Sequence, residues 1–292
     1  MLSIVRRRLY STSWKLIDHC PQPEYDTGCT HCKPKLPEHL AINTQRDLNN
    51  TKAAPYKHVL VLSHGYSSLD TMEPGISKHV GSLAYQIHHL NPDFHDPKYP
   101  VQVSNIILPN QEEILHRFNM TEGDNLVYLY PDNKAVKFKK DQLETFVKKY
   151  LKHDEIDDDI KYPHLNLDKI NINLTYDHFY EEAIAKHLVL ICAHGLTDRR
   201  CGIMGPLIQD EFHHVLRKES IRREVSVGLV SHIGGHAYAG NVVYFPRDCL
   251  RNRDMIWYGR VGPKQVQGIV KETIMNRNVI KSLLRGDPEL YR

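Results

Sequence analysis

The sequence of 292 residues predicts an α/β protein made of two similar halves, and three observations support this prediction. Short continuous apolar runs, typical of buried strands, alternate with segments whose apolar residues recur at helical spacing. The order of these segments in the first half is repeated in the second. The two halves also begin alike, with Lys-His-Val-Leu-Val-Leu at residues 57–62 and Lys-His-Leu-Val-Leu-Ile at residues 186–191. Internal duplication and the chance similarity of two buried strands are both open explanations.

The first half is expected to contain a strand, a helix, a strand, a hairpin and a helix. These elements are placed at residues 57–62, 75–90, 101–108, 125–130 with 135–138, and 141–151. In the first predicted helix, Ile76, Val80, Leu83 and Ile87 recur at intervals of three or four residues and would share one buried face. Residues 131–134, Pro-Asp-Asn-Lys, are a turn signal between the two hairpin strands.

The second half repeats this order. Its elements are placed at residues 186–192, 205–218, 225–230, 241–246 with 254–261, and 263–275. Pro206 is expected near the first turn of its helix, where the missing N–H is tolerated. A strand, a helix, a parallel strand, an antiparallel hairpin and a helix make up a thioredoxin-like fold. The sequence therefore predicts two thioredoxin-like α/β modules in one chain.

Composition sets the boundaries of these modules. The first, without metal-ligand residues at its strand ends, is assigned to residues 56–153, and the second to residues 183–292. A linker at 154–182 joins them and begins in an acidic run that cannot be buried. Residues 11–55 are polar, contain prolines and three cysteines, and are expected to be irregular.

The N-terminus has the composition of a mitochondrial presequence. Residues 1–10 contain three consecutive arginines, a serine and no acidic residue. Arg8 also stands at the offset from Ser11 that the matrix processing peptidase prefers, so cleavage near Tyr10–Ser11 and a matrix location are expected. A frayed basic terminus is the alternative explanation.

Overall composition argues against two classes of protein. The net charge of +3 is too small to indicate binding to nucleic acid. No apolar run approaches the roughly 18 residues that a membrane-spanning helix requires, so no transmembrane segment is expected.

Two cysteines and two histidines follow the predicted strands of the second half. Cys192 and Cys201 follow one strand, and His232 and His236 follow the next. Loops at the carboxyl ends of parallel strands meet at one edge of a sheet, so the four side chains are expected to converge. Two thiolates and two imidazoles are suitable ligands for either zinc or an iron–sulfur cluster. Their spacing matches neither a standard zinc finger nor a Rieske motif.

These residues carry a resemblance to a known family. The second half is similar to the sucrase/ferredoxin-like proteins, strongly over about residues 186–270 and more weakly over 56–150. The matching residues are the Cys192–Cys201 loop with Asp198, Arg200 and Gly202, then His232-Ile-Gly-Gly-His236 with Ala239-Gly240-Asn241, and then Trp257-Tyr258-Gly259-Arg260-Val261 with Pro263. The resemblance implies a thioredoxin-like ferredoxin domain and a [2Fe-2S] cluster held by Cys192, Cys201, His232 and His236. Residues 245–253 are longer than the turn usual before the Trp257 motif.

The expected function is electron transfer or redox quality control with redox proteins that the sequence does not identify. A structural zinc module that binds partners is one alternative. Another is a thiol redox protein that acts through Cys29 and Cys32, a C-x2-C pair with Cys20 nine residues before it. The sequence indicates no substrate pocket, and we assign no enzymatic reaction from it.

Overall fold

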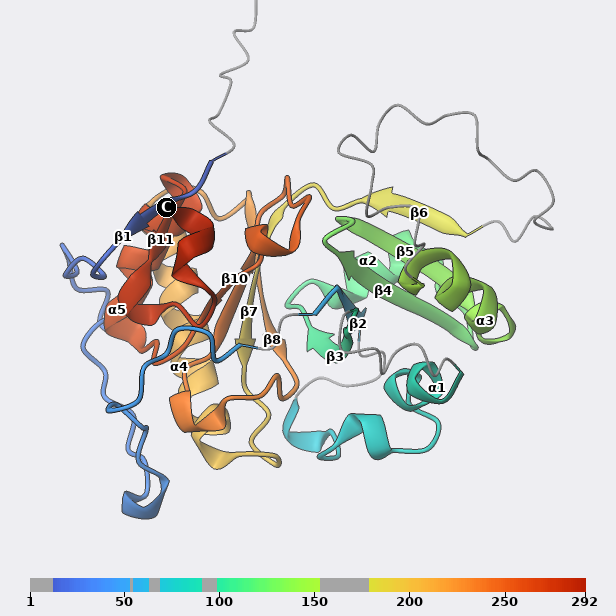
Figure 1. The fold of residues 1–292 in the computed structure, drawn as a ribbon, viewed down its shortest axis with the longest axis horizontal. Helices are drawn as coiled ribbons and strands as arrows, with labels where there is room; N and C mark the ends of the chain where they lie inside the picture. Colours follow the sequence, from blue (N-terminus) through green and yellow to red (C-terminus); the bar gives the residue numbers. More distant parts are fainter. Residues whose placement is uncertain (1–12, 53–54, 63–68, 91–98, 153–178) are drawn as a thin grey trace, which may run out of the picture.

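A computed structural model of the chain describes residues 13–52, 55–62, 69–90, 99–152 and 179–292. It shows a mixed α/β protein in which helices pack on a large mixed sheet (Figure 1). Among the described residues, no helix is long and apolar enough to cross a membrane. The predicted presequence, residues 1–10, lies outside the described residues.

The first half forms four neighbouring strands. β2 (Lys57–Leu62) lies parallel to β3 (Val101–Ile107) and antiparallel to β4 (Asp124–Tyr130), which pairs in turn with antiparallel β5 (Lys134–Lys139). The predicted strands and the predicted hairpin are confirmed. The strand order is β3-β2-β4-β5.

The second half has the same arrangement. β7 (His187–Cys192) lies parallel to β8 (Val225–Val230) and antiparallel to β9 (Val242–Phe245), and β9 pairs with antiparallel β10 (Ile256–Tyr258). The order β8-β7-β9-β10 therefore matches the order in the first half, strand for strand.

One sheet contains both halves. β3 and β8 pair antiparallel through Ile106 with Val230 and Ile107 with Leu229. Together with β6 (Tyr180–Ala183), which pairs with β5, the two halves form a nine-stranded sheet. β6 includes the last residues of the segment assigned to the linker, and residues 153–178 lie outside the described residues.

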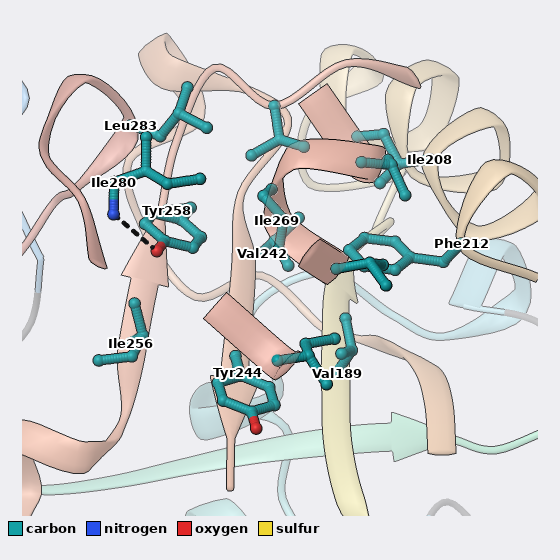
Figure 2. Close-up of a cluster of buried hydrophobic side chains, with 14 of the residues drawn as sticks. Val189, Ile208, Phe212, Val242, Tyr244, Ile256, Tyr258, Ile269, Ile280 and Leu283 are labelled. Atoms are coloured by element: carbon teal, nitrogen blue, oxygen red, sulfur yellow. Dashed lines mark hydrogen bonds between the residues drawn. The ribbon is translucent and has the colours of Figure 1, made fainter. Parts of the chain in front are cut away.

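Helices cover the outer face of each half. In the first half, α1 (Leu83–Leu90) and α3 (Leu143–Phe146) pack on the sheet through one apolar cluster. In the second half, α4 (Arg199–Lys218) and α5 (Pro263–Gly268) do the same. Figure 2 shows this second core, in which Ile208 and Phe212 of α4 belong to the same apolar cluster as strand residues such as Val189 and Tyr244. The second core fixes α4, and therefore its N-terminus, against β7 and β8.

The inner faces of the two halves pack against each other. One buried cluster contains Leu60 and Tyr130 from the first half and Leu190 and Trp257 from the second. The ring centroids of His58 on β2 and Trp257 on β10 lie 5.8 Å apart, although four strands separate β2 from β10 in the sheet. The sheet must therefore curve strongly, and the two halves share an interior.

The N-terminal segment, predicted to be irregular, contains a strand. β1 (Lys15–Ile17) pairs in parallel with β11 (Asn278–Ile280) in a separate two-stranded sheet. Trp14 is buried, and its indole N–H donates to Asp254 Oδ1 at 3.0 Å. Backbone pairing and one aromatic anchor thus hold this segment against the second half.

Two helix predictions differ from the structure, and one helix was not predicted. The helix expected over 75–90 begins only at Leu83, because Gly81 has a left-handed φ of 96°, and Val80 is exposed instead of buried. The helix expected at 205–218 begins six residues earlier, at Arg199, so Pro206 lies within it. α2 (Gln111–Arg117) was not predicted.

Candidate metal centre

The first candidate ligand, Cys192, is the last residue of β7. Its side chain is fully buried, and its backbone N–H donates to the carbonyl of Asn241 at 3.0 Å. Its neighbour across the parallel pair is Val230, the last residue of β8. Because the two strands end side by side, the segments that follow them meet at this edge of the sheet.

The second candidate ligand, Cys201, lies in the first turn of α4. Asp198 is the N-cap residue, and its carboxylate accepts the backbone N–H of Arg200 at 3.0 Å and binds the guanidinium of Arg200 at 2.8 Å. Cys201 is also fully buried. The positive end of the helix dipole favours a thiolate at this position.

Two glycines allow α4 to approach the end of β7. A Cβ atom on Gly205 would lie 2.4 Å from Cβ of Ala193, and one on Gly202 would lie 2.6 Å from Cα of Gly195. Both distances are far below van der Waals contact, so only glycine fits. This close packing brings Cys201 to Cys192.

The histidines lie on the loop after β8. Gly234 and Gly235, between them, have left-handed φ angles of 79° and 72°, which glycine adopts at little cost. The two imidazole centroids are 5.6 Å apart, with 30° between the ring planes. His232 is half-buried, whereas His236 is exposed at the start of a 3-10 turn.

Three of the four predicted ligands form a compact group. The sulfurs of Cys192 and Cys201 and a ring nitrogen of His232 all lie within 4.8 Å of one another, and this group could hold a metal ion. The group does not include His236, which lies four residues further along the loop. The structure therefore brings the cysteines together with one histidine and leaves the other at the rim.

The two thiols are strongly coupled. A hydrogen bond from Cys201, followed by interactions with His232, holds the pKa of Cys192 well below its ordinary value. The same hydrogen bond and then burial raise the pKa of Cys201. The pair thus stabilises one thiolate and one thiol, and a bound cation would replace the remaining proton.

His232 supplies a test of whether a metal fits. Its Nδ1 atom is buried and has no hydrogen-bond partner in the described part of the chain. An unpaired buried polar atom costs about 1–3 kcal/mol, and a metal ion bound at Nδ1 would remove that cost. The donors present, two sulfurs and imidazole nitrogen, fit zinc and iron–sulfur clusters alike.

The N-terminal cysteines do not join this group. Burial, and then a hydrogen bond with Cys32, raise the pKa of Cys29 to about 11. Burial raises the pKa of Cys20 to about 11, and its sulfur lies 3.6 Å from the carbonyl oxygen of Gln265 on α5. Thr30, between Cys29 and Cys32, donates a 2.7 Å hydrogen bond to Glu211 and fixes the C-x2-C turn on α4.

Sequence reasoning missed Arg285. Its guanidinium is buried and donates to Asn241 Oδ1 at 2.9 Å. The backbone carbonyl of the same residue, Asn241, accepts the N–H of Cys192. A single arginine 44 residues after Asn241 has no spacing signal that could reveal this contact.

The fold and donor set define an α/β protein with a cysteine–histidine group that could hold a metal ion. The chain belongs to the sucrase/ferredoxin-like family, whose profile matches residues 48–286. It is similar to proteins named altered inheritance of mitochondria protein 32. The protein from Meyerozyma guilliermondii is 42% identical over 93% of this chain and 95% of its own length. The protein from Clavispora lusitaniae is 42% identical over 96% of this chain and 98% of its own length. The protein from Debaryomyces hansenii is 37% identical over 98% of this chain and 100% of its own length.

Proposed function

We propose that this chain is a mitochondrial [2Fe-2S] protein that acts in electron transfer or redox quality control. The proposed ligands are Cys192, Cys201, His232 and His236. The observation that carries the proposal is the compact group of two buried sulfurs and the imidazole of His232, whose buried Nδ1 has no hydrogen-bond partner among the described residues. Membership of a ferredoxin-like family favours an iron–sulfur cluster over other metals.

The ligand charges determine which redox range the chain would support. Two ferric ions, two sulfides and two thiolates sum to zero, so a bound cluster would supply one-electron chemistry from a neutral oxidised form. Neutral imidazoles from His232 and His236 oppose an added electron less than two further thiolates would. In Rieske centres such ligation gives about −150 to +300 mV, compared with about −400 mV for plant-type ferredoxins.

The burial of the ligands indicates the route for electrons. Cys192 and Cys201 are fully buried beneath α4, whereas His236 is exposed. A redox partner protein would therefore reach the centre from the histidine side. The partner's identity does not follow from this surface.

Iron and sulfide analysis of anaerobically purified full-length protein tests the proposal. We expect two iron ions and two acid-labile sulfides per chain, with a red-brown colour. Stoichiometric zinc without sulfide would exclude the cluster and favour the structural zinc alternative, which is consistent with three ligand atoms close enough for a single ion.

A thiol redox activity of Cys29 and Cys32 is a second candidate, supported by the hydrogen bond between their side chains. The raised pKa of Cys29 lowers its thiolate fraction and therefore its reactivity. Alkylation of the full chain at neutral pH tests this function: Cys29 that reacts no faster than a free thiol would exclude it as an activated nucleophile.

The domain assignment remains part of the proposal. The shared strand order supports two thioredoxin-like modules, at 56–153 and 183–292, with the second as the ferredoxin domain. Both modules contribute strands to one sheet, so we expect them to unfold together.

We also propose a matrix location after removal of residues 1–10. The names of the similar proteins support a link to mitochondria, and the arginines of residues 1–10 support import. N-terminal sequencing of protein from isolated mitochondria should give a start near Ser11. Imported protein that retains Met1 would contradict this processing.

A further inference from the structure

Arg285 is a buried cation whose hydrogen bonds go to neutral acceptors. Its side chain is 1% exposed, and it donates to the carbonyl of Thr51 at 2.8 Å, to the carbonyl of Gly234 at 3.2 Å and to Asn241 Oδ1 at 2.9 Å. All three acceptors are neutral. Among the described residues, no carboxylate forms an ion pair with Arg285. Buried charges are normally paired, so this arrangement requires an explanation.

The contacts of Arg285 place it at the candidate metal centre. Gly234 lies between His232 and His236, and the backbone carbonyl of Asn241 accepts the N–H of Cys192. Burial lowers the pKa of Arg285, and the negative forms of Cys192, Tyr238 and Cys201, in decreasing order of effect, oppose this shift. Of the groups that favour the charge of Arg285, the one with the largest effect, Cys192, belongs to the candidate centre.

We propose that Arg285 is the counter-charge of the metal centre and favours the form that carries an added electron. This inference rests on the proposed [2Fe-2S] function. One electron from a one-electron donor protein would give the neutral oxidised centre one net negative charge, with no bond made or broken. A fixed positive charge in a buried site stabilises that form more than it would in water.

Arg285 also positions the histidine loop. It holds the carbonyl of Gly234, while Asn241 Nδ2 holds the carbonyl of Gly235 at 3.0 Å. A Cβ atom on Gly235 would lie 2.3 Å from Nη2 of Arg285, so the loop fits directly against the guanidinium. The effect of the charge can be separated from that of the guanidinium's several hydrogen bonds, because Arg285→Lys retains the positive charge and loses the planar set of donors.

The test compares Arg285→Gln and Arg285→Lys with the full-length wild-type protein. Potentiometric titration is the readout, with iron and sulfide content measured on each sample. We expect Arg285→Gln to reduce the equilibrium constant for reduction at least tenfold, a fall of about 59 mV for one electron. Arg285→Lys should fall less, because the positive charge remains.

Arg260→Gln is the matched control. The Arg260 guanidinium lies over the same Tyr238 ring as that of Arg285, 5.5 Å against 5.8 Å from its centroid, but Arg260 is partly exposed. Loss of its charge should change the potential less than Arg285→Gln does, because water screens it.

Arg285→Gln with full cluster content and an unchanged potential would overturn the inference. If Arg285→Gln does not retain iron and sulfide, Arg285→Lys becomes the test. Iron and sulfide bound to Arg285→Lys would support the role of the positive charge. A folded Arg285→Lys protein that binds neither would show that the hydrogen bonds alone matter. Wild-type protein without iron and sulfide would instead refute the proposed function, so the two failures are distinguishable.

Discussion

The two halves of the sheet have the same strand order, yet among the described residues the cysteine–histidine group that could hold a metal lies at the strand ends of the second half. In both halves, two parallel strands end side by side, and an antiparallel hairpin follows. The sequences differ after both parallel strands: Ser-His-Gly at 63–65 follows β2, whereas β7 ends in Cys192 and leads to Cys201. β3 is followed by Leu-Pro-Asn at 108–110, whereas β8 is followed by the loop with His232 and His236.

This comparison distinguishes the strand arrangement, which the halves share, from the ligand residues, in which they differ. Paired strand ends provide a place where two loops meet, but ligands are required on both loops to make a centre. In the second half, two further features support the ligands: glycines let α4 approach β7, and the C-terminal segment supplies Arg285. The fold alone therefore does not predict a metal site.

The largest effect should come from removal of a sulfur ligand. Cys192→Ser should reduce bound iron at least tenfold, because a serine hydroxyl does not readily lose its proton to bind the metal. Cys249→Ser is the matched control, since Cys249 is equally buried but outside the ligand group. Iron and sulfide analysis of both purified variants gives the result. Equal loss of iron from both would show that any buried cysteine matters only for folding.

The next largest effect is on the pH dependence of stability, and it involves two histidines at equivalent positions near the start of each half. His58 is fully buried, and burial lowers its pKa to about 3, whereas burial lowers that of the half-buried His187 to about 4. Below about pH 6.5 each of these histidines is protonated in the unfolded chain but stays neutral in the folded chain. The free energy of unfolding should therefore decrease as the pH falls below about 6.5. The decrease should continue to about pH 3 for His58 and to about pH 4 for His187, by at most about 1.4 kcal/mol per pH unit for each histidine.

Urea unfolding of metal-free protein at pH 7 and pH 4.5 measures this contribution. His58→Gln retains a partner for the Ser104 hydroxyl, which lies 3.0 Å from Nε2 of His58, and should make stability less dependent on pH. His187→Gln should do so to a smaller degree, because water reaches His187. A pH dependence unchanged by His58→Gln would contradict the buried neutral histidine.

Sequence patterns predicted the local parts of this structure well. The apolar runs of β2, β7 and β8, and the turn between β4 and β5, are signals within a few residues, and each matches the structure. The start of α4 was placed too late because Pro206 was taken as a first-turn residue. Asp198, an N-cap residue type, carried the better signal.

The parts that sequence missed depend on distant contacts. β1 has three residues and pairs with β11 near the other end of the chain, so no local pattern reveals it. The curvature that stacks His58 against Trp257 follows from the joining of two sheets. At the centre, the C-x8-C and H-x3-H spacings indicated a common site, but the partial separation of His236 depends on loop geometry.

A smaller effect should follow from blocking the approach of α4. Gly205→Ala would place Cβ 2.4 Å from Ala193 Cβ, so the helix must move despite the higher helix propensity of alanine. Overpacking of this kind costs about 1–3 kcal/mol. Gly286→Ala is the control, because its Cβ would meet nothing closer than 3.4 Å. Thermal unfolding should show a lower midpoint for Gly205→Ala alone, and equal midpoints would show that α4 moves away freely.

The smallest effect concerns the ligand chemistry that distinguishes the second half. His232→Cys replaces a neutral donor with an anionic thiolate, and the added negative charge opposes reduction. We expect the loaded variant to have a potential at least about 59 mV lower, a tenfold change for one electron. His236→Cys should lower it less, because His236 is exposed and water screens the new charge. Potentiometric titration of both variants, at matched iron and sulfide content, measures the difference. A potential that rises or stays constant in His232→Cys would mean that ligand charge does not control this centre, and the contrast between the two halves would then need another cause.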